Sequence, residues 1–193
     1  MLIFMFPALH GKAQLLDSAS LSLEPVFESI EEALKDPDKV FRLHLIKQKL
    51  TEVPKEIYQF KNLQELDLSK NRIKELQDTI GSLANLQILN LSKNNLELLP
   101  AAIGKLCNLK KLIVNQNSLT ALPVAIGDLK NLLVLDLWSN DISFFPDSLA
   151  DLKKLRYMDL QVILINGDEQ RKIQDMLPNT IIKFSPDCHC SGG

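Results

Sequence analysis

The sequence predicts an α/β solenoid, a fold in which one short unit of strand and helical turn is stacked repeatedly along the chain. A 23-residue pattern recurs five times without insertion, which chance does not maintain. Within the copies, apolar residues two apart predict a strand, and apolar residues three apart predict a turn. One copy cannot bury its own apolar side, so neighbouring copies must stack around a continuous core.

The repeats occupy residues 40–154. They begin at Val40, Leu63, Leu86, Leu109 and Leu132, and the first copy follows the pattern more loosely than the others. A degenerate sixth copy begins at Leu155 and loses the pattern after residue 160. We therefore expect five repeats over 40–154, followed by a degenerate repeat and a C-terminal cap over 155–186.

The strand and the turn of each copy follow from residue spacing. Leu66 and Leu68 lie two apart, so a short strand places both on the inward face. Ile80 and Leu83 lie three apart, which suits a helical or 3-10 turn. A proline precedes this turn in four copies, and proline cannot donate a hydrogen bond within a strand ladder. These prolines are Pro54, Pro100, Pro123 and Pro146.

A column of asparagines also recurs every 23 residues, between inward apolar positions. A buried amide must find hydrogen-bond partners, and it carries both donors and acceptors. We therefore expect an asparagine ladder that satisfies the backbone of the bend after each strand. Its members are Asn71, Asn94, Asn117 and Asn140, with Gln48 and Ile163 in their place in the outer copies.

The ends of a stack need caps, because an open end exposes apolar residues and strand edges. Residues 22–40 predict one short amphipathic helix that ends at Asp36-Pro37, so we expect a linker and a capping helix over 14–39. At the other end, residues 167–179 predict a second helix, and residues 180–185 alternate like a final edge strand.

The motif LxxLxLxxNxL followed by LPxxIGxLxNL resembles the leucine-rich repeat family, in the 23-residue class of Ras-suppressor and Scribble-like proteins. The resemblance covers about 40–177, with Gln77 in place of one expected proline. It implies a curved right-handed solenoid, with a parallel sheet on the concave side and helical turns on the convex side. It also implies a family whose members mostly bind proteins. The chain is further similar to small exported bacterial leucine-rich repeat proteins.

Composition narrows the class of partner. The 193-residue chain is 46% hydrophobic and carries 22 basic against 24 acidic residues, a net charge of −2. This balance excludes the basic footprint of a non-specific nucleic-acid binder. The sequence also has no apolar run of about 18 residues, so we expect no transmembrane segment.

The first residues allow two interpretations. Leu2 to Leu9 are mostly apolar, and Gly11 and Ala13 are small residues at the positions that a signal peptidase reads. We therefore expect a signal peptide over 1–13, cleavage before Gln14, and a secreted or periplasmic protein. However, no Lys or Arg precedes the apolar run. The alternative is an apolar arm that packs on the domain of a cytoplasmic protein.

The sequence contains no pattern of a catalytic or cofactor site. It has no glycine-rich phosphate loop and no HExxH motif, so we expect neither an enzyme nor a cofactor. We interpret His44 as a solvated strand residue and Cys107 as a plain thiol at or near the surface. The tail over 187–193 holds Cys188 and Cys190, which could form a disulfide, remain free thiols, bind a metal or link to another chain.

We place the candidate site on the outward strand positions. The later copies gather apolar residues there, including the only tryptophan, and such a group suggests binding to another protein. A covering C-terminal segment would explain the same residues. The alternative functions are a structural or self-associating envelope scaffold and an intracellular signalling regulator. We expect the protein to be a monomer or to self-associate weakly. The candidate residues are Ile88, Ile113, Val134, Trp138 and Tyr157, with Asp136 and Asp159 as a polar rim.

Overall fold

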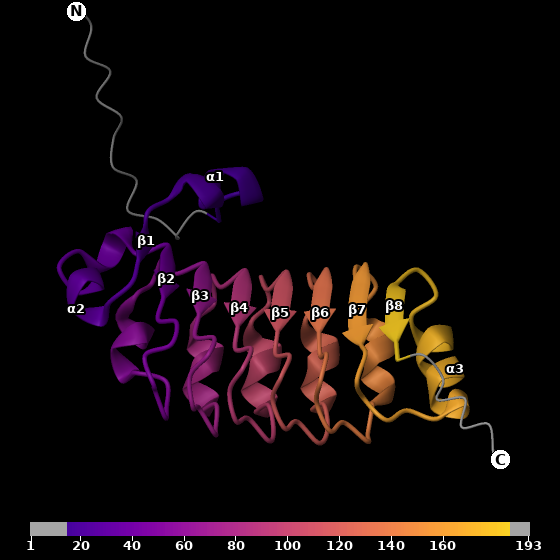
Figure 1. The fold of residues 1–193 in the computed structure, drawn as a ribbon. Helices are drawn as coiled ribbons and strands as arrows, with labels where there is room; N and C mark the ends of the chain where they lie inside the picture. Colours follow the sequence, from indigo (N-terminus) through magenta and orange to yellow (C-terminus); the bar gives the residue numbers. More distant parts are fainter. Residues whose placement is uncertain (1–14, 186–193) are drawn as a thin grey trace, which may run out of the picture.

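The structure, a computed structural model, describes residues 15–185 and confirms the α/β solenoid. Within this range the strands form one parallel sheet in chain order, and each strand pairs with the equivalent residues of the next coil (Figure 1). The strands are β1 (Val26–Phe27), β2 (Arg42–His44), β3 (Glu65–Asp67), β4 (Ile88–Asn90), β5 (Lys111–Ile113), β6 (Val134–Asp136), β7 (Tyr157–Leu160) and β8 (Ile181–Phe184).

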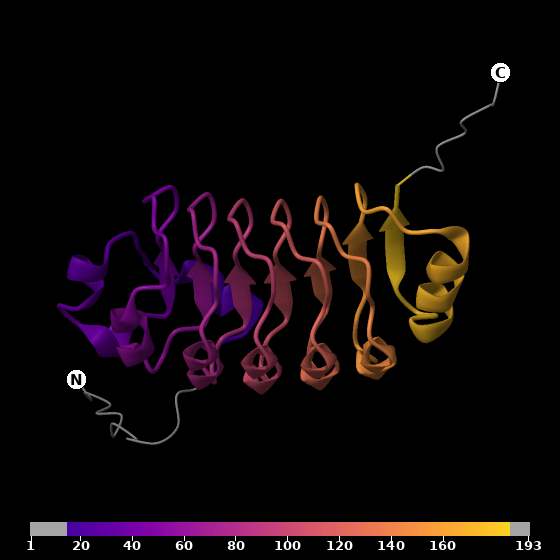
Figure 2. The same ribbon diagram turned by 90° about the horizontal axis from the view of Figure 1, so that it is seen from below.

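A row of 3-10 helices lines the side opposite the sheet (Figure 2). Each of the last four regular turns begins after a residue with φ near −70° and ψ near 150°, which is proline in three of them and Gln77 in the other. The turns are η2 (Lys55–Gln59), η3 (Asp78–Ser82), η4 (Ala101–Lys105), η5 (Val124–Asp128) and η6 (Asp147–Asp151), and a shorter η1 (Pro37–Lys39) precedes the first coil.

The core lies between the sheet and the turns and continues through every coil. Leu43, Leu66 and Leu89 are fully buried and lie in register on successive strands. The turns η3, η4 and η5 stack closely on the turn that follows each because glycine occupies their fourth position. A Cβ at Gly104 would lie 2.6 Å from the Ala125 carbonyl oxygen of the next coil, which no real side chain tolerates. Glycine here therefore sets the spacing of the convex side.

The predicted asparagine ladder has the expected geometry. Asn94 donates from Nδ2 to the carbonyl oxygens of Leu68 and Leu91, each at 3.0 Å, and its Oδ1 accepts from the Ile73 amide at 3.0 Å. Each asparagine therefore joins its own coil to the preceding one. The same pattern recurs at Asn71, Asn117 and Asn140.

A second asparagine ladder, absent from our sequence expectations, runs along the turns. Each member donates from Nδ2 to a backbone carbonyl of the preceding coil at 2.6–2.8 Å. In the last coil Lys154 takes this place and donates to Asn131 instead. The sequence signal for it is the asparagine that ends the first four copies, three times as LxN. Its members are Asn62, Asn85, Asn108 and Asn131.

The N-terminal cap differs from the single helix expected over 22–40. The segment instead forms α1 (Ser18–Leu23), strand β1 and α2 (Ile30–Ala33). Val26 and Phe27 pair with β2, because the open edge of that strand offers backbone hydrogen bonds that a helix would leave unmade.

At the C-terminal end, the expected helix is α3 (Gly167–Met176), which places Ile173 in the core. The expected final strand is β8, which pairs with β7. The predicted signal peptide over 1–13 and the tail with Cys188 and Cys190 lie outside the described residues.

Candidate functional site

The candidate site is the solvent side of the sheet, which we call the sheet face. Its outward residues form three parallel rows, because equivalent positions of successive strands lie in register. The first row is Ile88, Lys111, Val134, Tyr157 and Ile181, the second is Asn90, Ile113, Asp136, Asp159 and Lys183, and the third contains Asn115, Trp138 and Gln161.

The C-terminal half of the sheet face carries the apolar residues expected there. Val134, Tyr157 and Trp138 are half-buried, and β8 extends the first row with Ile181, which is 69% exposed. β8 lies beside β7 in the sheet, so this strand does not cover Trp138. The sequence predicted the edge strand but not its register, and therefore missed Ile181 and Lys183 as members of the face.

The sequence interpretation of these residues as one anchor needs a geometric correction. Val134 and Trp138 are four residues apart along one strand direction, roughly 13 Å at 3.3 Å per residue. The row that contains Asp136 and Asp159 runs between them. The two acids therefore separate two apolar edges instead of forming a rim. Lys111 likewise separates Ile88 from Val134.

Both acids also hold the backbone. The Asp136 Oδ1 accepts from the Trp138 amide at 3.1 Å, and the Asp159 Oδ1 accepts from the Gln161 amide at 3.0 Å. Asp67 and Asn90 make the same bond to the amide two residues later. This Asx turn explains why Asp or Asn recurs at the position in four strands, while His44, Ile113 and Lys183 hold it in β2, β5 and β8. The same bond fixes the backbone of Trp138.

Tyr157 is held in place by two neighbours. Its hydroxyl donates to Asp159 Oδ2 at 2.7 Å, and the Lys183 ammonium lies 5.5 Å from its ring centroid. The hydrogen bond to Asp159 and burial raise the pKa of the Tyr157 hydroxyl. The ring is therefore presented in a fixed orientation, which lowers the entropy lost on binding.

The N-terminal half of the sheet face carries an ionic cluster. Arg42 donates from Nε and Nη2 to the two carboxylate oxygens of Glu65 at 2.9 and 3.1 Å, and His44 Nε2 lies 2.6 Å from Glu65 Oε1. Burial alone would raise the pKa of Glu65, but the hydrogen bonds from His44 and Arg42 outweigh it and lower the pKa to about 2. The sequence suggested that His44 is a solvated strand residue. The structure shows instead that His44 is partly buried and contacts Glu65.

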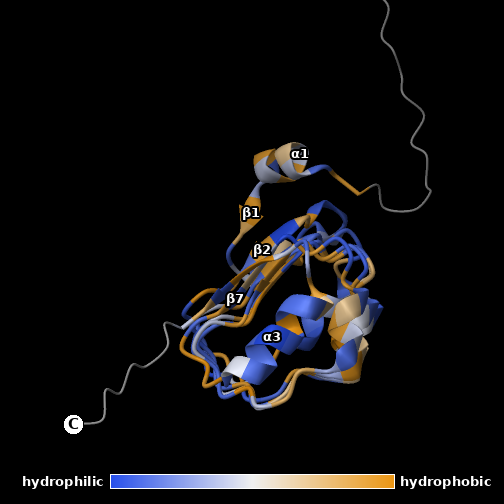
Figure 3. Ribbon diagram, turned by 90° about the vertical axis from the view of Figure 1, so that its right-hand side faces the viewer, coloured by the Kyte–Doolittle hydropathy of each residue, from blue (hydrophilic) through white to orange (hydrophobic). Residues whose placement is uncertain are grey.

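The segment that contains α1 lies on the outer side of the sheet, opposite the 3-10 turns and α3 (Figure 3). Leu16 bonds to Gln64 and Gln87, which immediately precede β3 and β4. Ile88 follows Gln87 and therefore lies where this segment crosses. Of the candidate residues, Ile88 therefore lies in the half of the sheet face that the α1 segment crosses, whereas Val134, Trp138 and Tyr157 lie in the C-terminal half.

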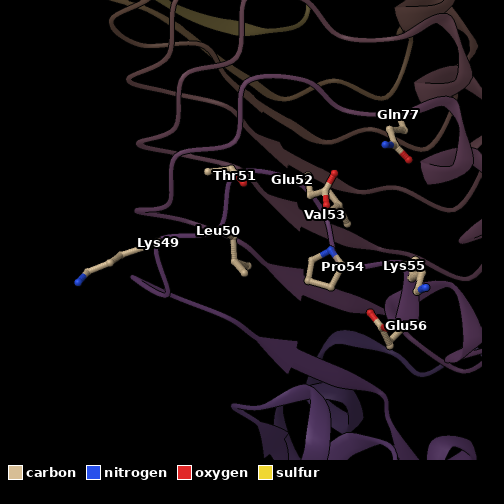
Figure 4. Close-up of a pocket in the computed structure, with 9 residues that line it drawn as sticks. All are labelled: Lys49, Leu50, Thr51, Glu52, Val53, Pro54, Lys55, Glu56 and Gln77. Carbon is tan, nitrogen blue, oxygen red and sulfur yellow. The ribbon is translucent and has the colours of Figure 1, made fainter.

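One open hollow of about 700 Å³ lies away from the sheet face, along the loop that leads into η2 (Figure 4). Its walls include Glu52, Pro54, Lys55 and Gln77, while the Lys49 side chain points away from the others (Figure 4). No candidate residue lines it. The hollow is therefore separate from the candidate residues on the sheet face.

Other chemical features of the described residues are few. Cys107 is an exposed free thiol. Within residues 15–185, no group of three or more His, Cys, Asp or Glu is placed to hold a metal ion. Over the same part of the chain, no helix is long and apolar enough to cross a membrane.

Comparison with known families identifies the class of protein. A family model described as "Leucine-rich repeat region" matches residues 72–185, more than half of the chain. The chain therefore belongs to the leucine-rich repeat family, as its motifs indicated. Proteins with this fold commonly serve as protein-interaction modules. No curated protein matches the chain.

Solved structures of the same fold include a leucine-rich repeat protein of Leptospira interrogans, 31% identical over 85% of this chain and 49% of its own length, with a TM-score of 0.63. Internalin C2 of Listeria monocytogenes is 24% identical, and the match covers 79% of this chain and 64% of the internalin chain, also with a TM-score of 0.63. The ectodomain of the Arabidopsis thaliana receptor kinase GASSHO1/SCHENGEN3, solved in complex with CASPARIAN STRIP INTEGRITY FACTOR 2, is 26% identical. This match covers 75% of this chain and 18% of the receptor chain, with a TM-score of 0.61. This chain spans less than two thirds of each.

Proposed function

We propose that the protein is a non-catalytic binding module that recognises another protein through the C-terminal half of its sheet face. The observation that supports this most is the partly exposed apolar row of Val134, Tyr157 and Ile181, with Trp138 two residues beyond the end of β6. Aromatic residues held in fixed orientation beside charged groups are typical of energetic centres in interfaces. The receptor ectodomain above, solved with a bound factor, gives a precedent for binding on this fold.

Substitution of Trp138 tests the proposal. Trp138→Ala should weaken binding of a captured partner by about 2 kcal/mol, roughly thirtyfold, because a buried aromatic anchor dominates such interfaces. The melting temperature should change little, since Trp138 is half-exposed and its backbone is held by Asp136. Affinity capture from native extract, followed by titration of the captured protein, measures the first effect, and a thermal melt measures the second.

Phe144→Ala is the matched control, because Phe144 is a large exposed aromatic residue outside the sheet face, in the loop after β6. It should leave binding unchanged. Equal losses from both variants would indicate general stickiness of apolar residues and contradict a site on the sheet face. A large loss of stability in Trp138→Ala would show that the residue serves packing instead.

A self-associating scaffold is the alternative, and the observation that favours it is that β8 is the edge strand of the sheet over residues 15–185, with Ile181 exposed. Light scattering over a hundredfold range of concentration separates the two functions. A mass that rises with concentration, and that Ile181→Lys returns to the monomer value, would support self-association.

We also propose that the protein is exported, with cleavage between Ala13 and Gln14, because an apolar run precedes small residues at this point. Intact-mass measurement of protein from the native cell should show the shortened chain outside the cytoplasm. Full-length protein in the soluble cytoplasm would contradict the proposal. The intracellular regulator would then become the better interpretation.

A further inference from the structure

The N-terminal segment over 15–24 crosses the sheet face without being part of the solenoid. Figures 1 and 3 show α1 on the outer side of the sheet, near the first strands. Leu21 is only 2% exposed, yet it is not a member of the core that continues between the coils. Leu21 is therefore buried outside that continuous core, in the segment that crosses the sheet face.

Two glutamines hold the backbone of this segment. The Leu16 amide donates to Gln64 Oε1 at 2.9 Å, and the Leu16 carbonyl accepts from Gln87 Nε2 at 2.8 Å. Gln87 Nε2 also donates to Gln64 Oε1 at 2.6 Å, and both side chains are at most 2% exposed. Both contacts to Leu16 are made to backbone atoms, so they would accept any residue in an extended chain.

The glutamine pair is a local feature of two coils. The next coils place Lys110, Leu133 and Arg156 at the same position. The stacking of coils alone therefore does not require an amide here. A buried amide pair that bonds a non-repeating segment has the character of a built recognition site.

Arg42 provides a second contact to the backbone. Its Nη1 donates to the carbonyl oxygens of Ser22 and Glu24, each at 3.2 Å, while Glu65 orients the guanidinium through Nε. Arg42 therefore binds backbone carbonyl groups that follow Leu21 in the chain. The three contacts, a clamp at Leu16, a buried Leu21 and carbonyls at 22 and 24, define what a ligand must present.

Few apolar contacts hold the segment over 15–24 on the sheet face. α1 has six residues, which is too short for stability on its own. Leu23 is 86% exposed, so α1 buries essentially one apolar side chain. Local opening of such a segment requires far less free energy than global unfolding.

We propose that Gln64, Gln87 and Arg42 form a binding site for a peptide segment of a partner protein that passes from an extended residue into a short helical turn, and that residues 15–24 occupy this site as a displaceable strap. The ligand presents a free backbone amide and carbonyl, a leucine five residues later, and accessible carbonyls beyond it. The strap would survive the proposed cleavage before Gln14. The site shares no residue with Val134, Trp138 and Tyr157, so it stands independently of the proposed function.

A synthetic peptide with the sequence of residues 14–25 is the probe, and full-length chains are the receptors. Leu21→Asp in the receptor should release the strap, because a carboxylate cannot occupy the buried leucine position. This variant should bind the fluorescent peptide at least tenfold more tightly than the unaltered chain, whose own strap competes at millimolar effective concentration. Hydrogen–deuterium exchange over 16–23 should be at least tenfold faster in the variant.

The glutamine clamp is tested by adding Gln87→Leu to the Leu21→Asp chain, since leucine occupies this position in the β6 coil. Peptide affinity should fall at least tenfold. Arg156→Ala, at the same position on the far coil, is the control and should change nothing.

Three outcomes would overturn the proposal. One is no peptide binding by a folded Leu21→Asp chain whose strap exchanges fast. Another is binding that survives Gln87→Leu. The third is a strap that stays protected in the Leu21→Asp chain, which would show that Leu21 does not hold it.

Discussion

At the scale of single residues, Glu65 shows how an outward strand position becomes structural. It lies on β3, one strand from Arg42 and His44, and accepts hydrogen bonds from both. Its side chain is only 14% exposed, so a carboxylate there depends on these partners for compensation. A pair one strand apart can be found from the sequence once the register of the repeats is known.

Glu65→Gln should destabilise the protein by about 2–3 kcal/mol at pH 7, because it removes the charge that a pKa of about 2 reports. The folded pKa is lowered, so the stabilisation is complete above the unfolded value of 4.5 and is lost as pH falls from there towards 2. Urea unfolding of both proteins between pH 2 and pH 7 should show their difference shrinking only in this acid range. Asp151→Asn, at an exposed ion pair with Lys130, should change stability by less than about 0.5 kcal/mol.

The two asparagine ladders should differ in strength. Asn94 is 8% exposed and bonds four backbone groups, so Asn94→Ala should cost about 1–3 kcal/mol through unpaired buried groups. Asn108 is half-exposed and makes one bond, to the Ala84 carbonyl at 2.8 Å, so Asn108→Ala should cost less than about 1 kcal/mol. Denaturant midpoints measure both. An Asn94→Ala midpoint equal to that of the unaltered protein would refute the role of the buried ladder.

At the scale of elements, the coils differ only where a repeat position is filled by an unusual residue. Gln77 precedes η3 with φ −72° and ψ 155°, while Pro100 and Pro123 precede η4 and η5 with almost the same angles. The backbone at Gln77 is therefore already that of a proline. The rest of the coil, and not a proline ring, therefore holds the backbone of Gln77 in this conformation.

Gln77→Pro should stabilise the protein by about 0.4–1 kcal/mol, because proline restricts the unfolded chain without straining this backbone. Leucine already precedes the prolines of the two following coils, so Leu76 should accept one as well. A thermal melt should show a rise of about 1–4 °C. Gln77→Ala, which adds no such restriction, should show none, and a lower melting temperature for Gln77→Pro would contradict the argument.

The sequence predicted the regular coils well because every copy repeats one environment. Leu66, Asn94 and Ile103 could be placed from spacing alone, and all three lie where the spacing indicated. The prediction failed where the copies stop. Val26 and Phe27 fit an amphipathic helix, yet they pair with an open strand edge, and two residues are too few for periodicity to distinguish the two states.

The candidate site was predicted only in part, for the same reason. Asp136 and Asp159 were visible as a column, but their bonds to the backbone depend on local geometry. The sequence analysis did not single out Gln64 and Gln87, because the residue that both bond, Leu16, belongs to a segment without repeats. Long-range contacts of this kind leave no periodic signal.

At the scale of the whole molecule, the coils form a linear stack in which each contacts chiefly its neighbours. Stability is then a sum over coils and interfaces, and the ends are the places where unfolding begins. The caps are unequal. The N-terminal end is closed by β1 and the four-residue α2, whereas α3 inserts Ile173 into the core.

Ile173→Ala should therefore loosen one end of the molecule before the rest. The lost packing is worth about 2–5 kcal/mol at a fully buried isoleucine. In a linear stack this loss acts mainly on the interface beside it. Hydrogen exchange should speed up most in β7 and β8 and least in β2 to β4. Leu89→Ala, a fully buried site on β4, should instead reduce protection on both sides of the centre. If Ile173→Ala lowered protection equally in every strand, the solenoid would unfold as one cooperative unit, and the end would have no stability of its own.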